Sequence, residues 1–373
     1  MKIICISDYH EFDSLEKEWN ALLEASGCQT LPLRHEWLSC FYKAFGNGAR
    51  LSVLAAWEGT ELAGLAPFTI CTRRIRGIPV RSVSFIGDPG WTTGHVIARE
   101  PKGPFINSIL DYLTKNCRWD LLYLWNMPRG EENAIIGGNL LSDLKFRSSC
   151  GANFPYIPIE GNWEEFKAAK SIKFRKVLRN KLNRINNAGQ VDVRCHSGTQ
   201  EIGRILPCIF ELGSKSWKYR AGISISSTNE NRYFYSELAG MLAPKGMVRI
   251  WVLNLNGSPA AFEYHLVLNG TIYALTAEYD EALSYLGLSP GSVLECLILE
   301  QAFKDGMREF DLGSGLHPYK LIWTNLIRRT ISLSIYRETV RGHFLNAVER
   351  SLPVLKRIKE AATGSAQKQK ADR

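Results

Sequence analysis

The stretch from Thr271 to Lys320 constrains the fold most strongly, because it reads as a strand, a helix and a second strand in immediate succession. Residues 271–277 are rich in β-branched and aromatic side chains, which favour a strand. From about Gly291 to Lys304, apolar residues recur at the i, i+3, i+4 spacing of a helix. The sequence FDLG then ends a second strand. The stretch therefore predicts one βαβ unit.

The loop between this first strand and the helix, LGLSPGS at residues 286–292, has the form of an anion site. Ser289 is placed as an N-cap and Pro290 at the first helical position. Gly291 and Ser292 leave the backbone uncovered, and the free N–H groups of a helix start favour a phosphate. A capped helix start without any ligand explains the same tripeptide. Both interpretations are kept here.

Short motifs follow one another in a fixed order through the second half of the chain. They are SWK at 216–218, FYSELA at 234–239, NGSPAAF at 256–262, EYD at 278–280, SPG at 289–291, FDLGSG at 310–315 and YKLIWT at 319–324. At these positions the sequence resembles the GNAT superfamily of N-acetyltransferases, and within it the CelD/BioF2-like family linked to bacterial cellulose synthesis. The resemblance covers most of residues 160–335.

Hairpin signals at Gly59 and Gly257, and helices starting near Gly103 and Gly291, suggest that one α/β unit occurs twice. The family resemblance implies the same. We therefore expect an α/β (α+β) protein of two tandem GNAT-like domains, each a mixed, largely antiparallel sheet flanked by helices. The expected parts are an N-terminal GNAT-like domain (1–160), a basic helix and linker (161–200), a C-terminal GNAT-like domain carrying the acyl-CoA site (201–337), and a basic amphipathic helix with a disordered tail (338–373).

Positive charge is concentrated in two segments of a chain whose formal net charge is +9. Residues 163–184 carry eight Lys or Arg against two Glu, and residues 350–373 carry seven against two acids. Phe174, Leu178 and Ile185 lie on the apolar stripe of a helix predicted in and just after the first segment. This helix is either a solvated linker or a contact for an anionic partner, through Arg175 and Arg179.

No metal site is predicted, because the nine cysteines include no CxxC pair and the seven histidines no HxxxH or HxE pattern. No apolar run approaches the ~20 residues that span a bilayer, and the first ten residues are too short and too soon acidic for a signal peptide. We therefore expect a cytoplasmic protein. Peripheral contact with the inner face of the membrane through the amphipathic segment 338–361 is the alternative to its docking on the body.

The resemblance also implies site residues. The strand 271–277 would line the pantetheine of acyl-CoA and offer backbone N–H groups to the thioester oxygen. Lys320 is carried over from the Fem-type peptidoglycan aminoacyltransferases, which the FDLGSG and YK motifs also resemble. The predicted catalytic residues are Lys320, Asp311 and Glu278, the two carboxylates because they lie at predicted strand ends, where ligands collect in a twisted α/β sheet. The implied cofactor-binding residues are Ala277, Ser289, Gly291, Ser292 and Val293. The implied substrate-binding residues are Trp217, Lys218, Arg175, Arg179, Tyr279, Asp280, His317 and Tyr319.

These features predict an acyltransferase that moves an acyl group, acetyl in the first instance, from acyl-CoA to an amine or hydroxyl of a sugar, polysaccharide precursor or peptide. One departure from the GNAT pattern concerns the CoA loop, which reads GLSPGS and lacks the Q/R-x-x-G-x-G/A form. One alternative is a Fem-like transferase that uses aminoacyl-tRNA, the only nucleic acid expected as a partner. A third is a non-catalytic module that binds a glycan or nucleotide.

Overall fold

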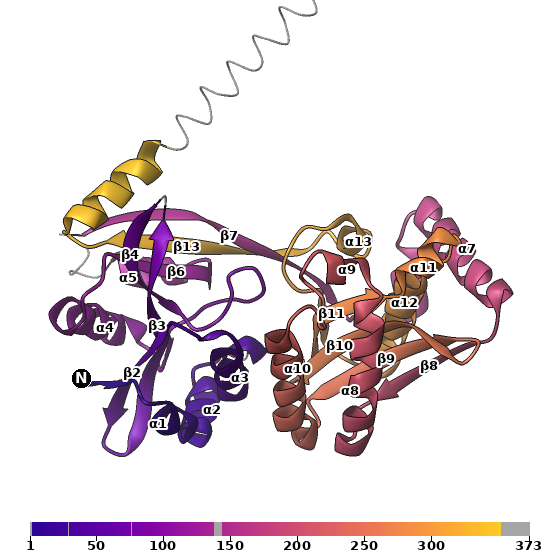
Figure 1. Cartoon of the computed structure of the whole chain (residues 1–373), viewed down its shortest axis with the longest axis horizontal. Helices are drawn as coiled ribbons and strands as arrows, with labels where there is room; N and C mark the ends of the chain where they lie inside the picture. The colour runs from indigo at the N-terminus through magenta and orange to yellow at the C-terminus, as the bar shows by residue number, and fades with distance from the viewer. Residues whose placement is uncertain (1, 29, 76, 138–143, 352–373) are drawn as a thin grey trace, which may run out of the picture.

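The computed structural model describes residues 2–28, 30–75, 77–137 and 144–351. In this part of the chain the strands form one 13-stranded sheet that runs through both halves of the molecule (Figure 1). The strand order is β1-β2-β3-β4-β6-β13-β7-β12-β11-β10-β9-β8, with β5 paired to β3. Most neighbours are antiparallel, and β4–β6 and β11–β12 are parallel.

In the N-terminal half, β2, β3 and β4 form an antiparallel meander, and α4 connects β4 to its parallel neighbour β6. The predicted hairpin is confirmed, with Gly59 at a φ of +62° in its turn. The elements are β1 (Ile3–Ile6), α1 (Tyr9–Asp13), α2 (Glu16–Ala25), η1 (Leu31–Leu33), α3 (His35–Phe45), β2 (Arg50–Glu58), β3 (Glu61–Ile75), β4 (Ile78–Phe85), β5 (Ile97–Ala98), α4 (Lys102–Asn116), β6 (Leu121–Pro128) and α5 (Glu131–Ile136).

The C-terminal half repeats this order, because β9, β10 and β11 form a meander and α12 connects β11 to its parallel neighbour β12. The predicted βαβ unit and the predicted fold class are confirmed. The elements are α6 (Trp163–Ala168), α7 (Ile172–Ala188), β8 (Val191–His196), α8 (Thr199–Ser214), α9 (Trp217–Arg220), α10 (Asn229–Leu242), η3 (Ala243–Lys245), β9 (Val248–Leu255), β10 (Ser258–Leu268), β11 (Thr271–Tyr279), α11 (Glu281–Tyr285), α12 (Pro290–Lys304), β12 (Glu309–Asp311) and α13 (Pro318–Leu321).

Two long strands join the halves: β7 (Lys145–Pro158) and β13 (Ile327–Tyr336), which run side by side in Figure 1. Strand β13 lies between β6 and β7 and so completes the sheet of the N-terminal half. The last residues of β7 pair with β12 in the C-terminal half. The sheet is therefore continuous, although β13 falls within the predicted segment 201–337. The domain boundaries themselves remain a prediction.

Helices α3 and α10 pack together and join the cores of the two halves. The ring of Phe234 on α10 lies 5.2 Å from that of Trp37 and 5.6 Å from that of Phe45, centroid to centroid. These aromatic contacts belong to one cluster of buried side chains that extends from α1 to β10. Apolar burial therefore fixes the two halves against each other.

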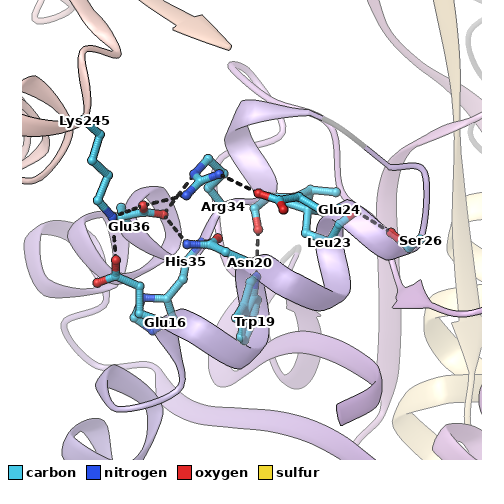
Figure 2. Close-up of polar contacts among 11 residues, drawn as sticks. Glu16, Trp19, Asn20, Leu23, Glu24, Ser26, Arg34, His35, Glu36 and Lys245 are labelled. Atoms are coloured by element: carbon cyan, nitrogen blue, oxygen red, sulfur yellow. Dashed lines mark hydrogen bonds and ion pairs between the residues drawn. The ribbon is translucent and has the colours of Figure 1, made fainter. Parts of the chain in front are cut away.

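A network of charged side chains around the buried Glu36 also links the two halves (Figure 2). Glu36 on α3 is fully buried and binds Arg34 through two hydrogen bonds, of 2.9 and 3.2 Å. Lys245, from the C-terminal half, donates to both Glu36 and Glu16. Burial opposes the charge of Glu36, but these contacts lower its pKa to about 2. The ionised carboxylate of Glu36 therefore links the two halves through its hydrogen bonds.

Residues 340–351 are helical and dock on the body of the protein. Leu345 is buried in a small cluster with Val80, Leu121 and Tyr336. The rest of the predicted amphipathic segment, including Pro353, and the predicted disordered tail lie outside the described residues. Membrane contact by this segment remains a prediction. Among the described residues, no helix is long and apolar enough to cross a bilayer.

Candidate active site

A cavity of about 1200 Å³ lies between the two halves and is lined by both. The C-terminal half contributes β11, the loop after β12 and α9. The N-terminal half contributes η1, the loop around residues 90–95 and the end of β6. Several residues implicated by the sequence meet at this cavity. They are Ala277, Asp311, Lys320, Trp217, Lys218, His317 and Tyr319.

Strands β11 and β12 separate at the cavity. Thr271–Tyr273 of β11 pair with Glu309–Asp311 of β12, and among the described strands none pairs with the rest of β11 on that side. On its other side, β11 skips one residue, Leu275, in the ladder with β10. Such a bulge turns a backbone N–H out of the ladder. The opening leaves backbone groups of β11 unpaired at the cavity, and the donor role that the family resemblance implies for this strand remains a prediction.

Lys320 lies at the base of this opening. It belongs to α13, its side chain is buried, and its Nζ donates to the carbonyl oxygen of Ser314 at 2.6 Å. A Cβ on Gly313 would lie 3.8 Å from this Nζ and 3.0 Å from the carbonyl oxygen of Ala274, so only a residue without a side chain fits here without strain. Burial lowers the pKa of Lys320 to about 8, with Asp311 opposing the shift.

The side chain of Asp311, at the end of β12, has structural partners on both of its oxygens. Its Oδ1 accepts from the backbone N–H of Gly313 at 2.8 Å, and its Oδ2 lies 3.1 Å from Nη1 of Arg328. Burial raises the pKa of Asp311, although the charges of Arg328 and Lys320 oppose the rise. The carboxylate therefore shapes the loop after β12 and also faces the cavity beside Lys320.

The acidic residues at the cavity that were not identified from the sequence include Glu263 on β10 and Glu295 on α12. Burial raises the pKa of both carboxyl groups, and for Glu295 the charge of Glu263 adds to the rise. The charge of Lys218 opposes the rise in the pKa of Glu263, and burial lowers the pKa of Lys218. The sequence contains a signal for both residues, because an acidic residue within an apolar run is costly to bury. Glu263 interrupts the run SPAAFEYHLVL, and Glu295 interrupts the run VLECLILE.

Glu278, a predicted catalytic residue, is buried but does not line the described part of the cavity. Its Oε1 accepts from the backbone N–H of Ile225 at 2.8 Å. Its Oε2 is buried and has no hydrogen-bond partner in the described part of the chain. In this structure the carboxyl group holds the turn after α9, so its catalytic role remains a prediction with less support than those of Lys320 and Asp311.

The predicted CoA loop forms the start of α12, outside the described lining of the cavity. The side chain of Ser289 makes no capping bond, and the N–H groups of Gly291 and Ser292 have no helical acceptor. Lys181 of the basic helix α7 donates to Oγ of Ser292 at 2.9 Å. Lys181, which is not among the predicted site residues, adds a positive charge to this helix start. Val293 is buried in the core, so only its backbone is available to a ligand.

The other predicted substrate contacts occupy different places. Arg175 and Arg179 are exposed on α7 and do not line the described cavity. Tyr279 packs beside the start of α12, where a Cβ on Gly291 would meet its ring at 3.2 Å. Asp280 caps α11 by accepting from the N–H of Ala282. Among the described residues, no three or more His, Cys, Asp or Glu side chains are arranged to hold a metal ion.

Comparison with known families finds a match in the C-terminal half. Residues 173–321 match the model of the acetyltransferase (GNAT) domain family. The matched residues include β11, α12, β12 and Lys320, which are the parts that build the opening at the cavity. No curated protein matches the chain. The narrower CelD/BioF2-like assignment remains a prediction.

The solved structures that are similar to this chain match it over both halves. A conserved protein of unknown function from Bacteroides thetaiotaomicron is 11% identical, with a TM-score of 0.57 over 90% of this chain and 100% of that one. FemX is 13% identical, with a TM-score of 0.55 over 90% and 97%. The C-terminal domain of a putative lysylphosphatidylglycerol synthetase from Agrobacterium fabrum is 10% identical, with a TM-score of 0.53 over 91% and 96%. At these identities the likeness concerns the fold.

Proposed function

We propose that this protein transfers an acyl group from acyl-CoA, with acetyl-CoA as the first candidate donor, to an amine or hydroxyl of an acceptor that enters the cavity from the N-terminal side. The observation that carries the proposal is the opening between β11 and β12, with Lys320 at its base and a bulge at Leu275. An extended pantetheine chain would bind along the free edge of β11 as an added strand does. The small side chains of Ala274 and Ala277 leave room beside it.

In the proposed reaction, the acceptor nitrogen or oxygen attacks the thioester carbonyl carbon, the C–S bond breaks and CoA leaves as the thiolate. Asp311 accepts the proton that the attacking group loses. The protonated Lys320 and the backbone donors near Leu275 stabilise the negative charge that develops on the carbonyl oxygen. The acyl group passes directly between the substrates, so no nucleophile of the protein is acylated.

The proposed roles give a pH dependence with a defined sign. Asp311 must be ionised, so the rate rises with pH through its raised pKa. Lys320 must be protonated, so the rate falls again above its pKa of about 8. We expect a bell-shaped profile of kcat/KM whose alkaline limb moves to higher pH in Lys320→Arg. A rate that keeps rising above pH 8 in the wild type would instead make Lys320 a neutral base.

Binding of the CoA phosphates at the start of α12 gives a second expectation. Lys181→Met should weaken CoA binding about tenfold, the effect of one lost charge-assisted hydrogen bond. Lys176→Met, on the exposed face of the same helix, is the matched control and should leave the affinity unchanged. Calorimetric titration with CoA measures both variants. Equal affinities for Lys181→Met and the wild type would place the phosphates elsewhere.

A Fem-like transferase that uses aminoacyl-tRNA is the second candidate. It is favoured by the fold similarity to FemX over both halves, and by the exposed cations Arg175, Lys176 and Arg179 on α7. In this case tRNA binding at physiological salt should weaken steeply as salt rises, and the triple Gln variant of these residues should abolish it. An absence of tRNA binding, together with acetyl-CoA turnover, would reject this candidate.

A further inference from the structure

The wall of the cavity formed by β13 and the end of β6 carries two arginines that are neighbours in the sheet. Arg129 follows the last residue of β6, and Arg329 lies on β13. Pro128 and Thr330 are paired across these antiparallel strands, so the next position on each strand brings Arg129 and Arg329 side by side. Both residues line the cavity.

Neither arginine has a counter-ion among the described residues, whereas the other cavity arginines are engaged. Arg328 forms ion pairs with Glu309 and Asp311, and Arg308 donates to Thr271 at 3.2 Å. Like charges on adjacent cross-strand positions repel each other. The repulsion between the two arginines therefore raises the free energy of the protein when the cavity holds no ligand. An anion bound between them would remove this repulsion.

A third cation lies on the same wall. His95 lines the cavity, and its Nδ1 is 3.0 Å from Oε2 of Glu131. Lys102 lies 2.9 Å from the other oxygen of this carboxylate, so Glu131 is shared by two cationic groups. Burial disfavours the charged imidazole, but the contacts with Cys28 and Glu131 raise the pKa of His95 to about 9. At neutral pH this wall therefore has an excess of positive charge.

We propose that Arg129 and Arg329 bind a phosphate group of the acceptor. The proposal rests on the proposed acyl transfer and names the class of acceptor: a phosphorylated compound, such as a sugar phosphate or sugar nucleotide. One guanidinium fork satisfies the two oxygens of a carboxylate, whereas a phosphate has oxygens for two forks at once. With its phosphate held on this wall, the acceptor extends its amine or hydroxyl across the cavity to Lys320.

Calorimetric titration with inorganic pyrophosphate tests this site, with CoA present at saturation so that the donor's own phosphate site is filled. Wild type should bind the probe, and Arg129→Met and Arg329→Met should each weaken binding at least about tenfold. Arg204→Met, an exposed arginine on α8 without an ion pair among the described residues, is the control and should bind as wild type does. Melting curves confirm that each variant is folded.

The outcomes separate this proposal from the proposed function. If CoA does not bind at all, the acyl-transfer proposal fails, and the titration without CoA still shows whether the two arginines bind the probe. If CoA binds but pyrophosphate affinity is the same in both arginine variants as in the wild type, or absent at millimolar concentration, the phosphate site is wrong. Tighter binding of succinate than of pyrophosphate, lost in the same variants, would replace the phosphate with a carboxylate and so overturn the proposal.

Discussion

Lys320→Ala is expected to lower the rate of the acyl-transfer step by roughly 10² to 10⁴, the range found when an oxyanion donor or an acid–base group is lost. The physical reason is its position, buried at the base of the opening between β11 and β12 with Nζ held by Ser314. Acyl-CoA affinity should change much less, because the rest of the binding edge of β11 stays in place. Single-turnover kinetics at saturating acyl-CoA measures the step directly.

Lys304→Ala is a matched control for this variant. Lys304 lies at the exposed end of α12, where it pairs with Glu300 one turn earlier, and its loss should leave both rate and affinity unchanged. Melting curves on both variants separate chemistry from folding. A Lys320→Ala protein with the full single-turnover rate would remove Lys320 from the mechanism.

Glu36→Gln is expected to lower the free energy of unfolding by about 3–5 kcal/mol, the typical result of breaking a buried ion pair from one side. The variant leaves Arg34 and Lys245 without the carboxylate that now binds both, and Arg34 is itself buried (Figure 2). Glu300→Gln, which removes a partly exposed i,i+4 ion pair with Lys304, is the control and should cost only a few tenths of a kcal/mol. Urea unfolding measures both.

The same network gives a pH dependence of stability. The pKa of Glu36 is lowered from 4.5 to about 2 by folding, so its stabilising contribution is complete above its unfolded pKa and is lost as pH falls through the folded one. Between about pH 4.5 and 2, wild type should therefore lose stability more steeply than Glu36→Gln. Parallel stability–pH curves for the two proteins would contradict this assignment.

Local sequence signals predicted much of the C-terminal half. Turn chemistry at Asn256-Gly257, the strand propensity of residues 271–277 and the Ser-Pro-Gly sequence at the start of α12 each act within a few residues, so each element was recognisable by itself. The place of Asp311 at the cavity followed from the βαβ order, which brings the ends of parallel strands to one edge of the sheet, and that of Lys320 from the short loop after this strand.

The remaining features depend on partners distant in the sequence. Strand β7 contains Ser148, Ser149, Gly151 and Asn153 and is half exposed, so its sequence has no clear strand pattern before β13 is placed beside it. The arginines of the N-terminal wall of the cavity also depend on the pairing of distant strands. Arg129 and Arg329 lie exactly 200 residues apart and become neighbours only because β13 inserts next to β6.

Calorimetric titration with acetyl-CoA tests the central claim most directly, in the wild type and in Ala277→Trp. Ala277 lies on the free edge of β11, where an indole ring would occupy the space proposed for the pantetheine. Wild type should bind acetyl-CoA, and Ala277→Trp should bind at least about tenfold more weakly, with a melting curve that shows a folded protein. Wild-type protein that binds neither acetyl-CoA nor longer acyl-CoAs would contradict the account and favour a non-catalytic module.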